Sequence, residues 1–169
     1  MNKDSLSEAN RQVKALVGVS GFSIGRAAAM AWMIFGSGES RYLLHIQCSF
    51  RIRDGEEILV SNLEMFYPSE KALGQPEYDP DLFDWDVQGD NRYDEWVKSI
   101  DPVFMEKAKV LDAMVNTWGD LTILLDQGIV IEVFVNVTCD ECWRLFNKPT
   151  DHFVMTGRGI DDNLDEHEE

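Results

Sequence analysis

Hydrophobic and polar residues alternate most regularly between residues 42 and 53. One face of this segment would carry Tyr42, Leu44, Ile46, Cys48, Phe50 and Ile52, and the other Leu43, His45, Gln47, Ser49, Arg51 and Arg53. A period of two is typical of a half-buried β-strand, and only Leu43 departs from it. The segment meets Asp54-Gly55, a pair typical of hairpin turns, so we expect residues 57–60 to return as a paired strand.

A second hairpin is predicted in the C-terminal half. Residues 120–125 lead through a turn at 126–128 into residues 129–137, where β-branched residues alternate. Three further strands are predicted at residues 107–116, 142–146 and 152–156. Because short turns join consecutive strands, we expect an antiparallel sheet.

Helical signals are fewer. Residues 5–16 begin with capping chemistry and contain no Gly or Pro, which predicts an N-terminal helix, and residues 92–100 predict another. Glycines at 18–25 indicate a break in regular structure. Residues 26–35 suit a helix at first and a buried strand in their second half. Residues 67–90 indicate a loop rich in Pro, Gly and Asp. We therefore expect an α+β fold, mainly antiparallel β-sheet with an N-terminal helix and one further helix near 92–100.

The length and composition predict one folded unit. At 169 residues the chain is long enough for a sizeable core, so we expect a single globular domain over residues 1–160 and an acidic disordered tail over 161–169. No apolar run approaches the roughly 20 residues of a membrane-spanning helix. The first residues lack the basic-then-apolar layout of a signal peptide, so we expect a cytoplasmic protein with reduced cysteines.

Charge narrows the classes of partner. The net charge is −16, and −10 remains once the six acids of residues 161–169 are set aside. Such a field repels nucleic acids and anionic membranes and speeds the encounter with a basic protein. We therefore expect neither nucleic acid nor membrane binding, and a basic protein as partner. The sequence carries no signal for an oligomeric state.

Cys139 and Cys142 form a C-x2-C pair, and His45 with Cys48 could complete four zinc ligands. Alternation places His45 and Cys48 on opposite faces of their strand, which opposes this zinc site. A redox pair is opposed by Asp140 and Glu141, which would raise the pKa of a neighbouring thiol, and by the strand that follows. We interpret the motif as an acidic turn between two strands.

Residues 84–95 resemble a calcium-binding loop. Asp84, Asp86, Gln88 and Glu95 stand at the ligand positions 1, 3, 5 and 12 of an EF-hand, with Gly89 at the turn position. Prolines upstream disfavour an incoming helix, and a second copy of the loop is absent. The alternative interpretation is a loop whose Asp and Asn side chains cap the following helix.

A serine nucleophile is also suggested by "GFSIG" at residues 21–25, which matches G-x-S-x-G, with Asp126 and His152 as partners in the order of an α/β-hydrolase. Only 22 residues precede Ser23, too few for the strands that such an enzyme places before its serine. P-loop, Rossmann and H-E-x-x-H motifs are absent. An enzyme is therefore the less favoured class, and no cofactor is expected.

Three segments carry a resemblance: "LLHIQCSFRIRDGEEILVSNLEMFYP" at 43–68, "FDWDVQGDNRYDE" at 83–95 and "ECWRLFNKPTDHFVMTGRGI" at 141–160. They resemble a group of small acidic bacterial proteins of unknown function, some regarded as candidate immunity proteins of polymorphic toxin systems. The resemblance implies a protein-interaction module, such as an immunity protein that binds a basic toxin domain. The alternatives are a calcium- or zinc-binding protein, and a small-ligand-binding or enzymatic domain with a pocket on a concave sheet face.

Overall fold

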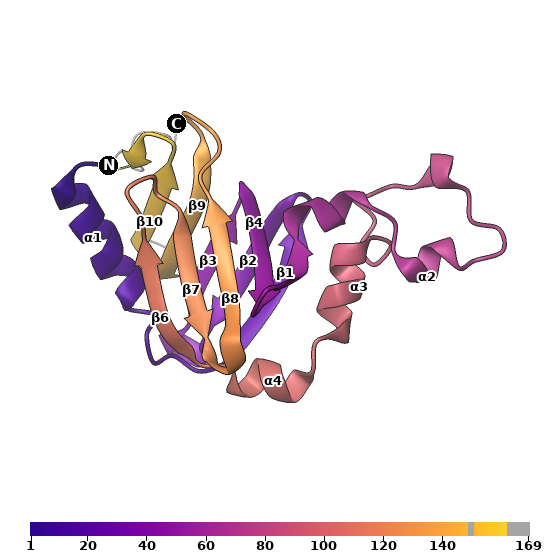
Figure 1. The fold of residues 1–169 in the computed structure, drawn as a ribbon, viewed down its shortest axis with the longest axis horizontal. Coiled ribbons are helices and arrows are strands. Elements are labelled where there is room, and N and C mark those ends of the chain that lie inside the picture. Colours follow the sequence, from indigo (N-terminus) through magenta and orange to yellow (C-terminus); the bar gives the residue numbers. More distant parts are fainter. Residues whose placement is uncertain (149–150, 162–169) are drawn as a thin grey trace.

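The strands form two antiparallel sheets that pack against each other, which confirms the α+β class (Figure 1). The computed structural model describes residues 1–148 and 151–161, so the predicted tail lies outside the described residues apart from Asp161. The six-stranded sheet has the order β1 (Phe22–Ala27), β2 (Met30–Phe35), β3 (Tyr42–Ile46), β9 (Glu141–Lys148), β10 (Asp151–Thr156) and β11 (Gly159–Ile160). The five-stranded sheet has the order β5 (Glu57–Ser61), β4 (Ser49–Asp54), β8 (Ile129–Phe134), β7 (Leu121–Leu125) and β6 (Val110–Val115).

The core lies between the two sheets and is built by the alternating residues of both. Leu44 and Ile46 from one sheet, and Phe50 and Ile52 from the other, are almost completely buried. Trp143 is also fully buried, and its indole Nε1 donates to the carbonyl of Gly119 at 3.0 Å. The two hairpins predicted at residues 42–60 and 120–137 are both present, as are the strands predicted near 142–146 and 152–156.

The predicted continuous strand at 42–53 is wrong in one respect. The chain leaves the six-stranded sheet after Ile46 and enters the five-stranded sheet at Ser49, so β3 pairs with β9 while β4 pairs with β8. Both halves turn the same face toward the shared core, and Cys48 at the crossing is itself buried. The alternation therefore continues across the break and does not reveal it.

A β-hairpin also occupies the region predicted as a glycine break. β1 and β2 pair in register and are joined by a tight turn in which Ala28 adopts a φ of 49°. Gly25 lies opposite Trp32, and a Cβ atom at Gly25 would stand 2.3 Å from the indole ring. Glycine at this position thus allows the indole to lie over the backbone.

Helix α1 (Lys3–Lys14) covers the free edge of β6 and confirms the predicted N-terminal helix. Asn2 caps it by accepting a hydrogen bond from the Ser5 amide at 2.8 Å. Asn10 donates its side-chain amide to the Val115 carbonyl at 2.9 Å and accepts from the Val115 amide at 3.0 Å. The Asn10 side chain therefore bonds to strand β6 as a neighbouring strand would.

The long connection from β5 to β6 contains the α-helices that follow α1. Residues 62–91, which we call the arm, begin at η2 with Met65 buried in the core, then project from the sandwich and return to it at α3 (Figure 1). The helices of this connection are η2 (Asn62–Phe66), α2 (Glu70–Leu73), η3 (Pro80–Leu82), α3 (Arg92–Ser99) and α4 (Pro102–Lys107); two other short turns are η1 (Gly38–Ser40) and η4 (Asp126–Gly128). In the described ranges no helix is long and apolar enough to cross a membrane.

Two details of the helical predictions differ from the structure. The helix predicted at 92–100 is α3, whereas α2 and η3 lie inside the predicted loop. The strand predicted from residue 107 begins only at Val110, because Asp101 caps α4 and Pro102 occupies its first turn.

Candidate interaction site on the arm

A buried ion pair joins helix α3, which directly follows the arm, to strand β1 of the sandwich. Arg26 on β1 is 4% exposed, and its Nε and Nη2 atoms each lie 2.9 Å from one carboxylate oxygen of Asp94 on α3. Burial alone would raise the pKa of the Asp94 carboxyl, but hydrogen bonds from Arg26 and from the Gly89 amide hold this pKa below its ordinary value. Asp94 is therefore held as a carboxylate, and it fixes the start of α3 against β1.

The turn before α3 wraps around the same guanidinium. Arg26 Nη2 donates to the carbonyls of Val87 at 3.2 Å and Asp86 at 3.5 Å, and Nη1 donates to that of Ala28 at 3.1 Å. Gly89, with a φ of 102°, brings its amide to 2.7 Å from the Asp94 carboxylate. The loop is thus organised around an internal cation, the side chain of Arg26.

The four proposed calcium ligands do not converge in this loop. Asp84 accepts a hydrogen bond from the Asp86 amide at 3.0 Å, and the Asp86 carboxylate lies 3.8 Å from Arg26 Nη1. Gln88 donates to the Arg26 carbonyl at 3.4 Å. The Glu95 carboxylate turns away and accepts from two backbone amides at the start of α2, the nearer at 2.9 Å. The predicted capping role is present in Asn91, whose side chain accepts from the Asp94 amide at 2.8 Å.

The proposed zinc ligands are only partly brought together. Cys48 and Cys142 are buried and close enough for each thiol to affect the pKa of the other, whereas Cys139 is exposed in the turn before β9. His45 lies on the outer face of the six-stranded sheet, with its ring centroid 5.0 Å from that of Phe146. Within residues 1–148 and 151–161 no group of three or more His, Cys, Asp or Glu residues is placed to hold a metal ion.

The two buried thiols, Cys48 and Cys142, are both harder to ionise than a free thiol. Burial and the neighbouring Cys142 raise the pKa of Cys48 to about 12, and burial also raises the pKa of Cys142. Both groups are therefore neutral thiols at physiological pH.

The acidic turn predicted around Asp140 is present as the bend that leads into β9.

The serine motif is placed on a regular strand. Ser23 lies within β1, paired opposite Ile34, and not at a strand-to-helix turn. Its suggested partners belong to other elements: Asp126 follows β7 and accepts from the Lys109 amide at 3.0 Å, and His152 lies on β10, stacked on Phe146 with 4.4 Å between ring centroids. Ser23 therefore lacks the strained strand-to-helix turn that a nucleophile elbow requires.

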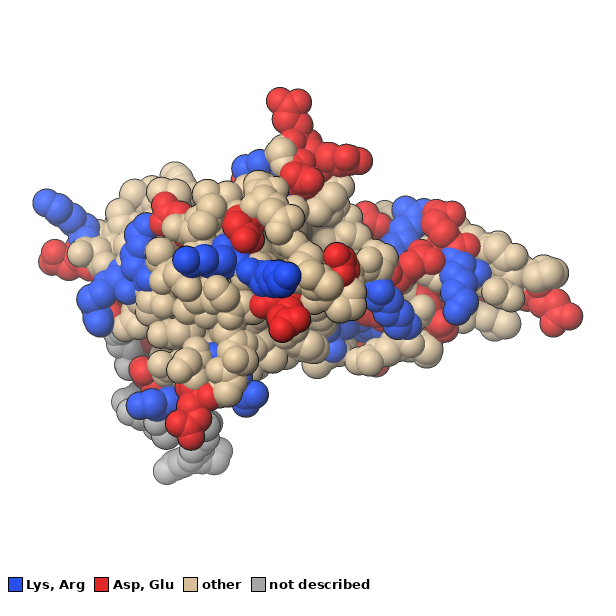
Figure 2. Space-filling view, turned by 90° about the horizontal axis from the view of Figure 1, so that it is seen from below, with Lys and Arg blue, Asp and Glu red and all other residues tan. Residues whose placement is uncertain are grey.

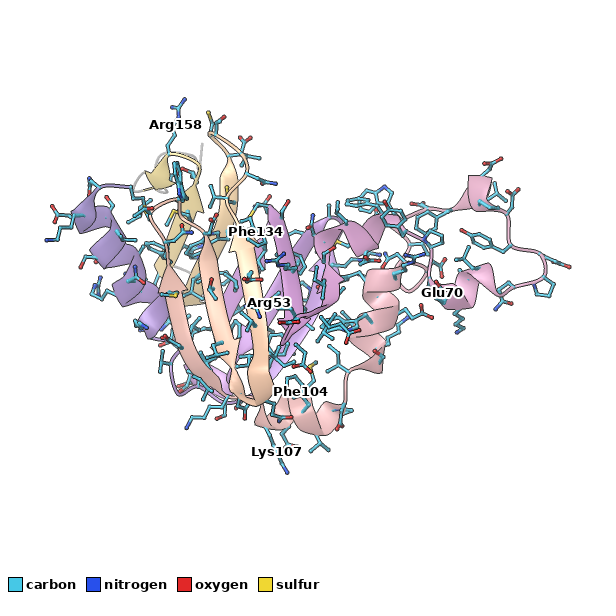
Figure 3. All side chains as sticks on the ribbon, viewed as in Figure 1. Arg53, Glu70, Phe104, Lys107, Phe134 and Arg158 are labelled. Atoms are coloured by element: carbon cyan, nitrogen blue, oxygen red, sulfur yellow. The ribbon has the colours of Figure 1, made fainter. Side chains whose placement is uncertain are left out.

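Within residues 1–160, negative charge is concentrated on the arm. Residues 62–91 contain eight acids and one lysine, a net charge of −7, whereas residues 1–61 and 92–160 together carry only −3. Figure 2 shows acidic and uncharged side chains at the outer end of the arm, and both acidic and basic side chains nearer the sandwich. Glu70 lies on this projecting part, away from Arg53 and Phe134 on the open face of the five-stranded sheet (Figure 3).

A groove of about 440 Å³ runs between α2, η3 and the turn before α3. Its charged residues are four acids and one base: Glu77, Asp79, Asp84, Asp90 and Lys71. Its walls also contain apolar side chains, of which Leu82 is 79% and Val87 48% exposed. The groove therefore combines negative charge with apolar surface open to solvent, a combination typical of sites that bind another molecule.

A second hollow of about 330 Å³ lies between η2, α2 and α3. Arg92 stands within it, 3.8 Å from a carboxylate oxygen of Glu64 and 3.7 Å from one of Glu70. Its guanidinium also lies over the Tyr67 ring, 5.5 Å from the centroid. Because these charges are already paired, the first groove is the better candidate for binding an external cation.

Sequence reasoning did not identify Arg26 or Asp94. The two residues are 68 positions apart, and Arg26 lies in a segment whose strand was not predicted. The concentration of acids at residues 62–91 was readable from the sequence, but only the structure gathers four of them around a groove. No family model, no curated protein and no solved structure matches the chain.

Proposed function

We propose that this chain is a protein-interaction module that binds a basic protein partner through its arm. The observation that carries the proposal is the distribution of charge: the arm holds −7 in 30 residues and the rest of the fold is nearly balanced. A partner of the kind implied by the sequence resemblance, a basic toxin domain, has the complementary charge. By binding such a toxin domain, the protein would block its activity.

The anchoring of the arm supports this role. A binding surface loses less conformational entropy on association when it is already ordered. The bidentate pair of Arg26 with Asp94 fixes the turn that forms one wall of the groove, and Ser69 caps α2 by accepting from the Ala72 amide at 3.0 Å. The acidic side chains are therefore presented from a defined backbone.

Charge complementarity predicts how the association rate depends on salt. Exposed charges mainly raise the association rate and lose this effect as salt screens them. Neutralising arm acids should therefore slow association with the basic partner and flatten its dependence on salt, with a smaller effect on dissociation.

Co-purification with the full chain as bait tests the proposal. In the test variant Asp79, Asp81 and Asp84 become Asn, which keeps the oxygens that accept the amide hydrogen bonds of Asp81 and Asp86. In the control variant three exposed acids outside the arm, Glu39, Glu56 and Glu57, become Gln. We expect the wild type and the control to retain a basic partner at moderate salt and the arm variant to lose it.

Two results would contradict the proposal. One is the capture of a basic partner to the same extent by the arm variant and the wild type. The other is the absence of any basic protein among the partners that the wild type retains.

A further inference from the structure

The groove on the arm is more than a patch of acids. Leu82 belongs to η3, and Val87 lies in the turn held by Arg26, so two different elements bring exposed aliphatic side chains to the lining of the groove. Asp79 caps η3 and Pro80 fixes its first turn, so Leu82 is carried by an ordered backbone. Exposed aliphatic groups on ordered walls indicate an apolar occupant between them.

We propose that this groove binds an extended segment of the basic partner in which lysine or arginine residues flank one apolar side chain. The inference rests on the proposed function and names the recognition element within it. The apolar side chain enters between Leu82 and Val87. The flanking cations lie against Glu77, Asp79, Asp84 and Asp90.

The size and charge of the groove support this occupant. A volume of about 440 Å³ falls within the range of about 300–1,000 Å³ typical of sites for small ligands or for a few side chains. Four acids against Lys71 leave a net charge of −3, which three basic residues would balance. A small polyamine would satisfy this charge but would leave the aliphatic walls uncovered.

Two labelled synthetic peptides test the inference by fluorescence anisotropy with the full chain. The first has lysines on both sides of a central leucine, and the second carries serine in place of that leucine. Burial of a leucine side chain contributes enough that we expect the leucine peptide to bind about tenfold more tightly or better. Spermidine serves as the purely cationic competitor.

Variants of the protein localise the effect. Leu82→Ser should abolish the preference for the leucine peptide, and because Leu82 is 79% exposed, the variant should melt as the wild type does. Leu111→Ser, on the exposed side of β6, is the matched control and should keep the preference. Asp79→Asn with Asp84→Asn should weaken both peptides equally and flatten the salt dependence.

The outcomes separate the inference from the proposed function. Equal binding of the two peptides, no binding of either, an unchanged preference in Leu82→Ser, or competition by spermidine as effective as that by the leucine peptide would each overturn the groove assignment. If the arm variant nevertheless loses the basic partner in co-purification, the proposed function stands while this inference fails. If the arm variant retains that partner, the proposed function itself fails.

Discussion

Arg26 and Asp94 lie 68 residues apart in the sequence and form a bidentate ion pair with two N···O distances of 2.9 Å. This pair connects strand β1 to helix α3 and encloses the turn at residues 86–89. Since the guanidinium is nearly inaccessible to water, its partners within the fold provide the solvation that water would otherwise give. These polar contacts hold the end of the arm, beside the apolar anchoring of Met65 and Tyr93 in the core.

Replacing Arg26 with Met should destabilise the protein. The substitution keeps the length of the apolar stem but leaves the Asp94 carboxylate without its cation and the carbonyls of Asp86 and Val87 without a donor. Removal of one partner from a buried ion pair costs about 3–5 kcal/mol. We expect a loss near 3 kcal/mol in the free energy of unfolding, measured by urea denaturation; a loss below about 1 kcal/mol would contradict a structural role for the pair.

Acid should weaken the same attachment. The pKa of Asp94 is lower in the folded protein than its ordinary value, so its contribution to stability is fully present above the unfolded pKa and is lost as the pH falls through the folded pKa. Below about pH 4, limited proteolysis should therefore cut the arm of the wild type increasingly fast. In Asp94→Asn, which cannot titrate at this position, the arm should be cut faster at neutral pH and show a weaker pH dependence; an unchanged profile would refute the assignment.

The three cysteines should react with thiol reagents at different rates. Cys139 is exposed, whereas Cys48 and Cys142 are buried and have raised pKa values, that of Cys48 about 12. Since the thiolate is the reactive form, iodoacetamide at pH 8 should label Cys139 first, and the other two only on unfolding. Peptide mass spectrometry reads out the order. Rapid labelling of all three in the folded protein would be incompatible with this packing.

Calcium should leave the melting temperature unchanged. The centre of the loop at 84–95 is occupied by the guanidinium of Arg26, and Glu95 is engaged at the start of α2. A bound divalent cation would have to displace this internal cation. Thermal melting with calcium and with EDTA checks the expectation, and a stabilisation by calcium that Glu95→Gln abolishes would revive the calcium site.

Much of the sheet architecture could be predicted from local patterns, because alternation reports which side chains face a core. It could not show the crossing between β3 and β4, since Ile46 and Cys48 both remain buried across it. The β1–β2 hairpin was missed because its turn uses Ala28 in a left-handed conformation and lacks the Gly or Asn that normally marks such turns. The sequence therefore lacks the usual signal for this turn, although β1 and β2 pair along their whole length.

The candidate site was less predictable than the fold. The acids of residues 62–91 are evident in the sequence, but the spacing of Asp84, Asp86, Gln88 and Glu95 suggested a bound metal ion. Their actual arrangement depends on Arg26, a long-range partner that no local spacing identifies. Pairings of this kind are set by the tertiary fold, so only the structure could distinguish an internal cation from an external one.

Asn10 affects whether strands of two molecules of this protein can pair edge to edge. Its side-chain amide occupies both backbone groups of Val115 on the edge strand β6, where an incoming strand of another molecule would otherwise pair. Exposed sheet edges are templates for fibril growth, and proteins commonly protect them. Helix α1 and this amide together block such growth at that edge, and Asn10→Ala would remove the partner of both backbone groups of Val115.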